Sequence, residues 1–273
     1  MGGSDQWRLL FRASAALALI AGLLLFAGAT RTEDYFSWTI APAQTAAFLG
    51  AAYWAAAVLF SWASAQRNWA SLRIAFFPEL TVAVLLLIAT FTNLEKFHSD
   101  LFGYFWLVVY AIATPVLIYL LAMREPDASE PAPREPMPSW LRLALIAQGA
   151  IFAVYGVGLF IAPSGFDSAW PWALTPLTAR AIASFLLGFA VAAAIAVSGN
   201  CLRRFRGAAL TYAVLGALEL LAVALHSSDF KDGAGLPLFV LFFAGVLAVG
   251  VAGSLPNLAA QPASKSRNAA SLS

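Results

Sequence analysis

The sequence predicts an all-α integral membrane protein with eight transmembrane helices, arranged as two tandem, parallel four-helix repeats. Three observations predict this: an apolar composition, eight long uncharged runs and a pattern that recurs in the second half of the chain. Hydrophobic residues make up 61% of the chain and charged residues 11%, against about 45–50% and about 25% in soluble domains. A water-soluble fold cannot bury so much apolar surface, so we expect the chain to lie in a lipid bilayer.

Eight runs between charged residues are long enough to cross a hydrocarbon core about 30 Å thick, which requires about 20 helical residues. Backbone polar groups cannot stay unpaired in lipid, and these runs are too continuous for barrel strands, so each run predicts an α-helix. The runs lie between Arg12 and Arg31, Asp34 and Arg67, Arg73 and Glu95, Asp100 and Arg124, Arg142 and Asp167, Arg180 and Arg203, Arg206 and Asp229, and Asp232 and Lys265.

The first run has an alternative interpretation. Arg8 and Arg12, the apolar residues after them and the small residues at 27–29 are typical of a secretory signal with its cleavage site. However, LLLFAGA at 23–29 occupies the place in the first half that VGLFIAP at 157–163 occupies in the second half, where no signal can stand. A retained helix therefore fits the sequence better.

A tandem duplication explains two similar segments, WTIAPAQTAA at 38–47 and WALTPLTARA at 172–181. A Pro-rich, charged segment at 124–138, REPDASEPAPREPMP, separates the halves and favours an extended, solvated spacer. We expect four-helix units at 1–123 and 139–256, a cytoplasmic linker at 124–138 and a disordered tail at 257–273. A shift of 134 residues, reduced by one after the next loop, superposes Trp38 on Trp172, Pro42 on Pro176, Arg73 on Arg206 and Phe97 on Phe230.

Basic residues near the ends of the runs predict the orientation, because cytoplasmic loops are enriched in Lys and Arg. With the N-terminus inside, twelve basic residues lie on the inner side and four on the outer side, so both termini should be cytoplasmic. The inner residues are Arg8, Arg12, Arg67, Arg73, Arg124, Arg134, Arg142, Arg203, Arg204, Arg206, Lys265 and Arg267, and the outer residues are Arg31, Lys96, Arg180 and Lys231.

The repeated Trp and Pro residues have a structural interpretation. Trp38 and Trp172 should lie in outer loops, with the indole N–H in contact with water and the ring at headgroup depth. Pro42 and Pro176 should begin helices, and Thr175 is suited to cap the second of them. The functional alternative is an outer vestibule built from Trp38, Trp172, Pro171 and Arg180.

Two acidic residues, Glu79 and Glu219, lie within the apolar runs, where ionisable groups are costly and are functional candidates. We expect Glu79, which follows Pro78, in the first turn of the third helix near the inner surface, with a structural role.

Glu219 should lie near the bilayer centre, because 13 residues separate it from Arg206 and 10 from Asp229. Tyr212 and His226 are seven residues away on either side, on the same helical face. Glu219 is therefore a candidate proton or substrate site together with these two residues. The alternative is a neutral carboxyl that is hydrogen-bonded to a neighbouring helix, for example through Gln148.

A second group of polar residues, His98 with Asp100 and His226 with Asp229, follows the third helix of each unit. Two His and two carboxylates suit a divalent metal or a pH sensor. However, the shift places His98 opposite Lys231, so the two motifs are not equivalent, and solvated loops are the simpler interpretation. We therefore expect no metal and no cofactor. Cys201 is the single cysteine, which excludes an internal disulfide.

The sequence favours a carrier or permease for a small solute or lipid, with Glu219 as the polar or protonatable group. The alternative is a non-transporting accessory or scaffold subunit with a protein partner or a second copy, and a membrane-embedded enzyme is less favoured because no catalytic motif is found. A net charge of +2 with scattered basic residues argues against nucleic-acid binding. Thirteen Arg against three Lys are typical of a GC-rich bacterial gene, and hence of the inner (plasma) membrane.

Overall fold

The computed structural model describes residues 3–123 and 135–255, and these residues form helices and connections without a strand. This confirms the all-α prediction. Within the described ranges, eight helices are long and apolar enough to cross a membrane, as predicted. They are α1 (Gly3–Ala27), α3 (Ala43–Ser64), α4 (Trp69–Phe91), α5 (Leu101–Ala122), α6 (Ser139–Ile161), α8 (Pro176–Gly199), α9 (Leu202–His226) and α10 (Gly235–Ser254). Most of the expected linker, 124–134, and the expected tail lie outside the described residues.

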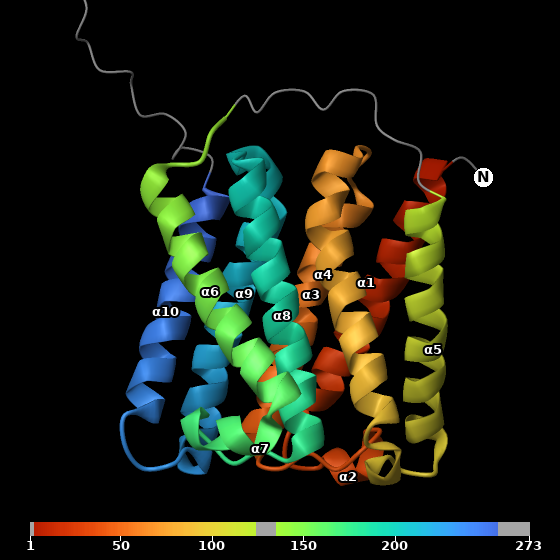
Figure 1. The fold of residues 1–273 in the computed structure, drawn as a ribbon, viewed down its shortest axis with the longest axis vertical. Coiled ribbons are helices and arrows are strands. Elements are labelled where there is room, and N and C mark those ends of the chain that lie inside the picture. Colours follow the sequence, from red (N-terminus) through yellow and green to blue (C-terminus); the bar gives the residue numbers. More distant parts are fainter. Residues whose placement is uncertain (1–2, 124–134, 256–273) are drawn as a thin grey trace, which may run out of the picture.

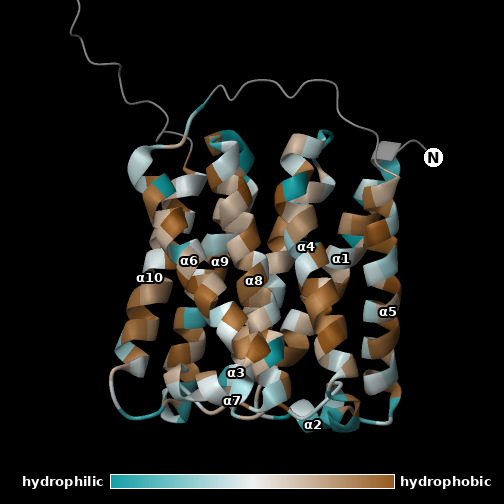
Figure 2. Ribbon diagram, viewed as in Figure 1, coloured by the Kyte–Doolittle hydropathy of each residue, from teal (hydrophilic) through white to brown (hydrophobic). Residues whose placement is uncertain are grey.

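Short helical turns, which the sequence did not predict, fold the connections at one end of the bundle. They are α2 (Thr32–Tyr35), the 3₁₀ turn η1 (Leu94–Lys96), α7 (Pro163–Phe166) and the 3₁₀ turns η2 (Asp167–Ala169) and η3 (Ser227–Asp229). In Figure 1, α2 and α7 lie at the bottom, whereas α1 and α6 begin and α5 and α10 end at the top. Figure 2 shows hydrophobic residues along the helices and hydrophilic residues mostly near the helix ends and connections.

The long helices pack in a defined pattern around α3 and α8, which are the most buried of the eight. Helix α1 packs against α3, α6 against α8, and α10 against α9. Two further pairs, α4 with α8 and α3 with α9, join the first half of the chain to the second (Figure 1). Helix α5 packs against α4 less extensively than α10 packs against α9.

Small residues allow α3 to occupy the centre. Ala47, Ala51 and Ala55 recur at four-residue spacing and are fully buried. Gly50 faces the backbone of Phe26 in α1, so that a side chain there would collide with it. Because lipid supplies no hydrophobic drive for helices to associate, such rows of small residues stabilise the bundle by letting backbones approach closely.

The helix that carries Glu79 begins earlier than the sequence suggested. Helix α4 starts at Trp69 and is capped by Asn68, whose side-chain oxygen accepts a hydrogen bond from the Ser71 N–H at 2.9 Å. Pro78 therefore lies inside α4. The expectation that Glu79 occupies a first turn near the membrane surface is wrong, because Glu79 follows the start by ten residues, or about 15 Å at the usual helical rise. Proline is tolerated inside membrane helices when neighbouring helices surround it.

The start of α8 agrees with the sequence. Thr175 forms a capping box with Thr178, and Pro176 is the first helical residue. Pro42 lies immediately before Ala43, the first residue of α3. Both prolines thus lie where the missing N–H costs no helical hydrogen bond.

We predict that Gly216→Leu destabilises the contact between α9 and α10. A Cβ atom at Gly216 would lie 2.6 Å from the Leu247 backbone nitrogen, so the helices must separate, at a cost of about 1–3 kcal/mol. The neighbouring exposed residue supplies a control, Ala217→Leu, which should stay within about 0.5 kcal/mol of the wild type. Thermal unfolding in detergent measures both variants, and equal melting temperatures would contradict the close approach.

Candidate functional site

A cavity of about 200 Å³ lies in the first half of the chain. Its walls come from α1, α3, α4 and α5, with α8 and α9 closing the side toward the second half. Most lining side chains are apolar. Among the described residues that line it there is one acid, Glu79, and no Lys, Arg or His. The polar lining residues are Ser14, Tyr35, Ser37, Tyr53, Glu79, Tyr110, Thr211 and Tyr212.

The cavity opens between α1 and α5 onto the apolar outer surface of the bundle. Leu17 and Ile20 from α1 and Phe102 and Phe105 from α5 line it, and these side chains are between 36% and 57% exposed. They lie on helices long and apolar enough to cross a membrane. A molecule dissolved in lipid can therefore reach the cavity from the side, without passing through water.

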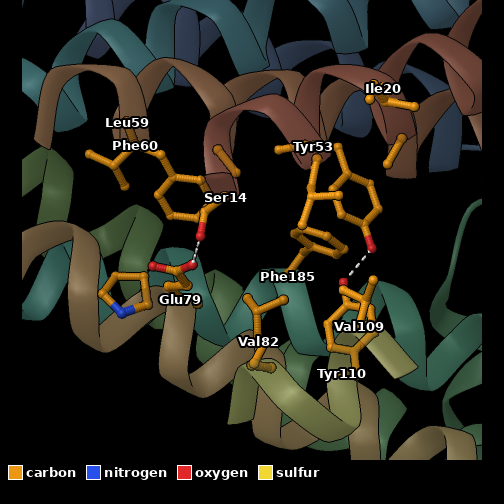
Figure 3. A pocket seen from close by; sticks show the side chains of 18 of the residues that line it. Ser14, Ile20, Tyr53, Leu59, Phe60, Glu79, Val82, Val109, Tyr110 and Phe185 are labelled. Carbon is orange, nitrogen blue, oxygen red and sulfur yellow. Dashed lines mark hydrogen bonds between the residues drawn. The ribbon is translucent and has the colours of Figure 1, made fainter. Parts of the chain in front are cut away.

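One end of the cavity holds a carboxyl group. Ser14 Oγ in α1 donates a hydrogen bond to Glu79 Oε1 in α4, and Figure 3 shows the two side chains pointing toward each other. The second oxygen, Glu79 Oε2, is buried and has no hydrogen-bond partner within the described ranges. The carboxyl is thus held in place by one oxygen and has the other available for a further partner.

A second polar pair lies beyond Val82 and Phe185 from Glu79 (Figure 3). The hydroxyl oxygens of Tyr53 in α3 and Tyr110 in α5 are 2.6 Å apart, so one hydroxyl donates to the other. The accepting hydroxyl keeps its own proton and can donate it to a third group. The Tyr53 ring contacts Phe185 edge to face at 4.8 Å, which fixes the tyrosine at the cavity wall.

Sequence reasoning assigned no role to Ser14, Tyr53 or Tyr110. Tyr53 is ten residues from the start of α3, and Tyr110 is nine residues from the start of α5. Both helices start at the same end of the bundle, so the two hydroxyls lie at a similar depth. This common depth was a usable signal for the tyrosines, whereas nothing in the sequence joins Ser14 to Glu79.

The predicted site around Glu219 is divided by the fold. Glu219 is fully buried, its two oxygens have no hydrogen-bond partner in the described part of the chain, and it does not line the cavity. Gln148 is also buried, and the hydrogen bond expected between these two residues is not formed. Tyr212 does line the cavity and its hydroxyl is unpartnered among described residues. His226 is the last residue of α9 and is half-buried.

The expectation that the two tryptophans keep their indole N–H in water is wrong. Trp172 is fully buried and donates to Thr45 Oγ1 at 2.8 Å, and Trp38 is 3% exposed. The short turns of the connections fold aromatic residues around both indoles, which removes them from solvent. The rings in contact are Phe36, Trp38, Phe97 and Trp106 in the first half and Trp170, Trp172, Phe230 and Phe239 in the second.

The residues of the proposed outer vestibule do not share one surface. Trp38 and Trp172 belong to the two different aromatic clusters. Arg180 Nε donates to the Phe160 carbonyl at 3.3 Å, which ties α8 to α6. Pro171 accepts a backbone hydrogen bond from Lys231 at 2.8 Å. These contacts hold loops and helix ends in place.

The outer His and Asp residues also make structural contacts. The ring nitrogens of His98 lie 3.0 Å from the Phe36 carbonyl and 3.2 Å from Thr39 Oγ1. Asp100 caps α5 by accepting from two backbone N–H groups, each at 3.0 Å. Asp229 accepts from the Gln44 N–H at 2.9 Å, at the start of α3. No group of three or more His, Cys, Asp or Glu that could hold a metal occurs in 3–123 or 135–255.

No protein-family model, no curated protein and no solved structure matches this chain. The cavity with Glu79 and the tyrosine pair is therefore the feature from which a function has to be argued.

We predict that Tyr53 and Tyr110 are energetically coupled. Tyr110→Phe removes the partner of the Tyr53 hydroxyl and leaves a polar group unpaired, at a cost of about 1–3 kcal/mol. The double variant Tyr53→Phe with Tyr110→Phe should cost less than the sum of the single variants, by about 0.5–3 kcal/mol. Unfolding in detergent measures this double-mutant cycle. Additive single effects would show that the hydrogen bond contributes nothing.

Proposed function

We propose that this protein is a carrier for a small lipid-soluble molecule, which enters the cavity from the bilayer between α1 and α5. The observation that carries the proposal is a lipid-facing cavity with a carboxyl group inside it. Polar and ionisable groups within membrane segments are costly and usually serve a substrate or ion path. A scaffold has no use for such a cavity.

In this proposal Glu79 takes the role that the sequence suggested for Glu219. Glu79 lines the cavity and has one unpartnered oxygen among the described residues, whereas Glu219 lies outside the cavity. The carboxyl and the tyrosine pair would bind the polar part of the molecule, and the apolar walls would cover the rest.

We also propose that the two halves are parallel repeats. Three sets of contacts support this. The aromatic clusters occupy positions related by the shift of 134 or 133 residues. The backbone bond from His98 to Ser37, at 2.9 Å, has its counterpart in that from Lys231 to Pro171, at 2.8 Å. The pairing of α4 with α8 corresponds to that of α9 with α3.

The same correspondence suggests that only the first half carries a site. Ala18 corresponds to Phe152, and Glu79 corresponds to Tyr212. The Phe152 ring lies 5.1 to 6.2 Å from the rings of Phe189, Tyr212 and Phe242. Aromatic side chains thus fill the space in the second half that is open in the first.

Filling the cavity tests the carrier proposal. Ala18→Phe places the second-half residue in the cavity from α1, and Ala113→Phe fills it from α5. In proteoliposomes, the wild type should speed the transbilayer movement of at least one of three probes: cationic ethidium, anionic anilinonaphthalene sulfonate or uncharged phenylnaphthylamine. Both filling variants should return that rate to the level of protein-free liposomes.

Matched controls place the same side chain outside the cavity. Leu19→Phe and Ala111→Phe lie on exposed faces of α1 and α5 and should keep the wild-type rate. Melting temperatures of all four variants show whether the fold survives. If folded filling variants move the probes as the wild type does, or if the wild type moves none of them, the carrier proposal fails and the scaffold alternative gains.

We predict that both chain termini lie in the cytoplasm. The ends of the bundle where α1 and α6 begin carry the predicted inner basic residues, and positively charged ends stay inside. Reporter fusions after residue 273 and before residue 1 in a bacterial host should be active as cytoplasmic fluorescent proteins and inactive as alkaline phosphatase. Opposite locations for the two ends would contradict an even number of crossings.

A further inference from the structure

We infer that the cavity binds a lipophilic organic cation, which pairs with the Glu79 carboxylate after displacing its proton. This inference rests on the proposed function and names the chemical class of the carried molecule. The geometry that supports it is a single buried carboxyl in a cavity walled by aromatic rings, with no cationic side chain among the described residues that line it.

The charge inventory favours a cation over the other classes. The other titratable groups that line the cavity are Tyr35, Tyr53, Tyr110 and Tyr212, from α2, α3, α5 and α9, and none of them carries positive charge. An anionic headgroup would find no Lys or Arg in the lining. An uncharged ligand would leave a carboxylate unpaired in hydrocarbon, which costs a few kcal/mol. Only a cation offers the missing partner.

Aromatic side chains supply the second part of a cation site. Phe60 lies beside Ser14 and Glu79 in Figure 3, and Phe185 lies between Glu79 and the tyrosine pair. Trp106 and Tyr110 also line the cavity, with ring centroids 4.5 Å apart. Aromatic faces attract alkylammonium groups by about 0.5–2 kcal/mol each when water is excluded.

The size of the cavity limits the cation. A cavity of about 150 Å³ is sufficient for benzene, and this one measures about 200 Å³. One aromatic ring with a small quaternary or tertiary ammonium group therefore matches the available space. Larger substituents would extend through the opening between Leu17 or Ile20 of α1 and Phe105 of α5 into lipid.

The exchange conserves charge within the membrane. Without a ligand, the carboxyl keeps its proton, since an unpaired charge in hydrocarbon is costly. When the cation enters, the O–H bond of Glu79 breaks, the proton leaves to water, and the carboxylate and the cation form an ion pair. No covalent bond to the ligand forms, and one positive charge replaces another.

The test is equilibrium binding of phenyltrimethylammonium to the full-length protein in detergent. Its uncharged isostere, tert-butylbenzene, and the anion benzenesulfonate are the matched ligands. Calorimetry measures affinity, and a pH-indicator dye in weak buffer at neutral pH measures proton release. We expect saturable binding of the cation with release of about one proton, and binding of the other two ligands weaker by about tenfold or more.

Two variants separate the role of Glu79 from general effects of buried acids. Glu79→Gln keeps the shape and should weaken cation binding by about tenfold or more and abolish proton release, while Glu79→Asp should retain proton release. Glu219→Gln removes the other buried acid, which lies outside the cavity, and should leave both readouts unchanged.

The outcomes distinguish this inference from the carrier proposal. Equal binding of the cation and tert-butylbenzene, or binding by Glu79→Gln at wild-type strength, overturns the cation inference. If an uncharged or anionic probe is nevertheless moved in proteoliposomes and Ala18→Phe stops it, the carrier proposal stands without a cation. If cation binding and proton release occur while no probe is moved, the cation site stands and the carrier proposal fails.

Discussion

Close backbone packing between helices is the constraint on which this structure depends. In lipid, apolar side chains gain little by leaving their surroundings, so helices associate through close contact and internal hydrogen bonds. Helix α3 meets this requirement with fully buried alanines, which bring it against α1 and α9. The pairs α4 with α8 and α3 with α9 then join the two halves into one bundle.

The cavity lies where this close packing is relaxed. On α10, Gly250 and Gly253 face α9, where side chains would collide with Ala213 and Phe205. The shift of 133 residues that relates the halves places Leu117 and Leu120 of α5 at these positions. Leu117 is fully buried and lines the cavity. Leucine in place of glycine holds α5 farther from α4, and the space left between α1 and α5 opens to lipid.

Composition and local patterns predicted the helices, whereas the features that depend on tertiary packing were missed. Eight helices and the Thr175 cap are visible in apolar runs and capping residues. The start of α4 was wrong because Pro78 resembles a helix start, although the helix continues through it from Trp69. Glu219 was favoured over Glu79 on depth alone. Which acid lines a cavity depends on the neighbouring helices, and no pattern within one helix reports that.

The outer end of α3 is held by residues of the second half. Trp172 donates to Thr45, and Asp229 accepts from the Gln44 backbone, both in the first turn of α3. The centre of the bundle is thus anchored at this end, whereas α5 has its most extensive helix contact with α4 alone. Any gate that admits or releases a molecule would swing on α5, as a door on a fixed frame, and the hinge would lie in the connections flanking that helix.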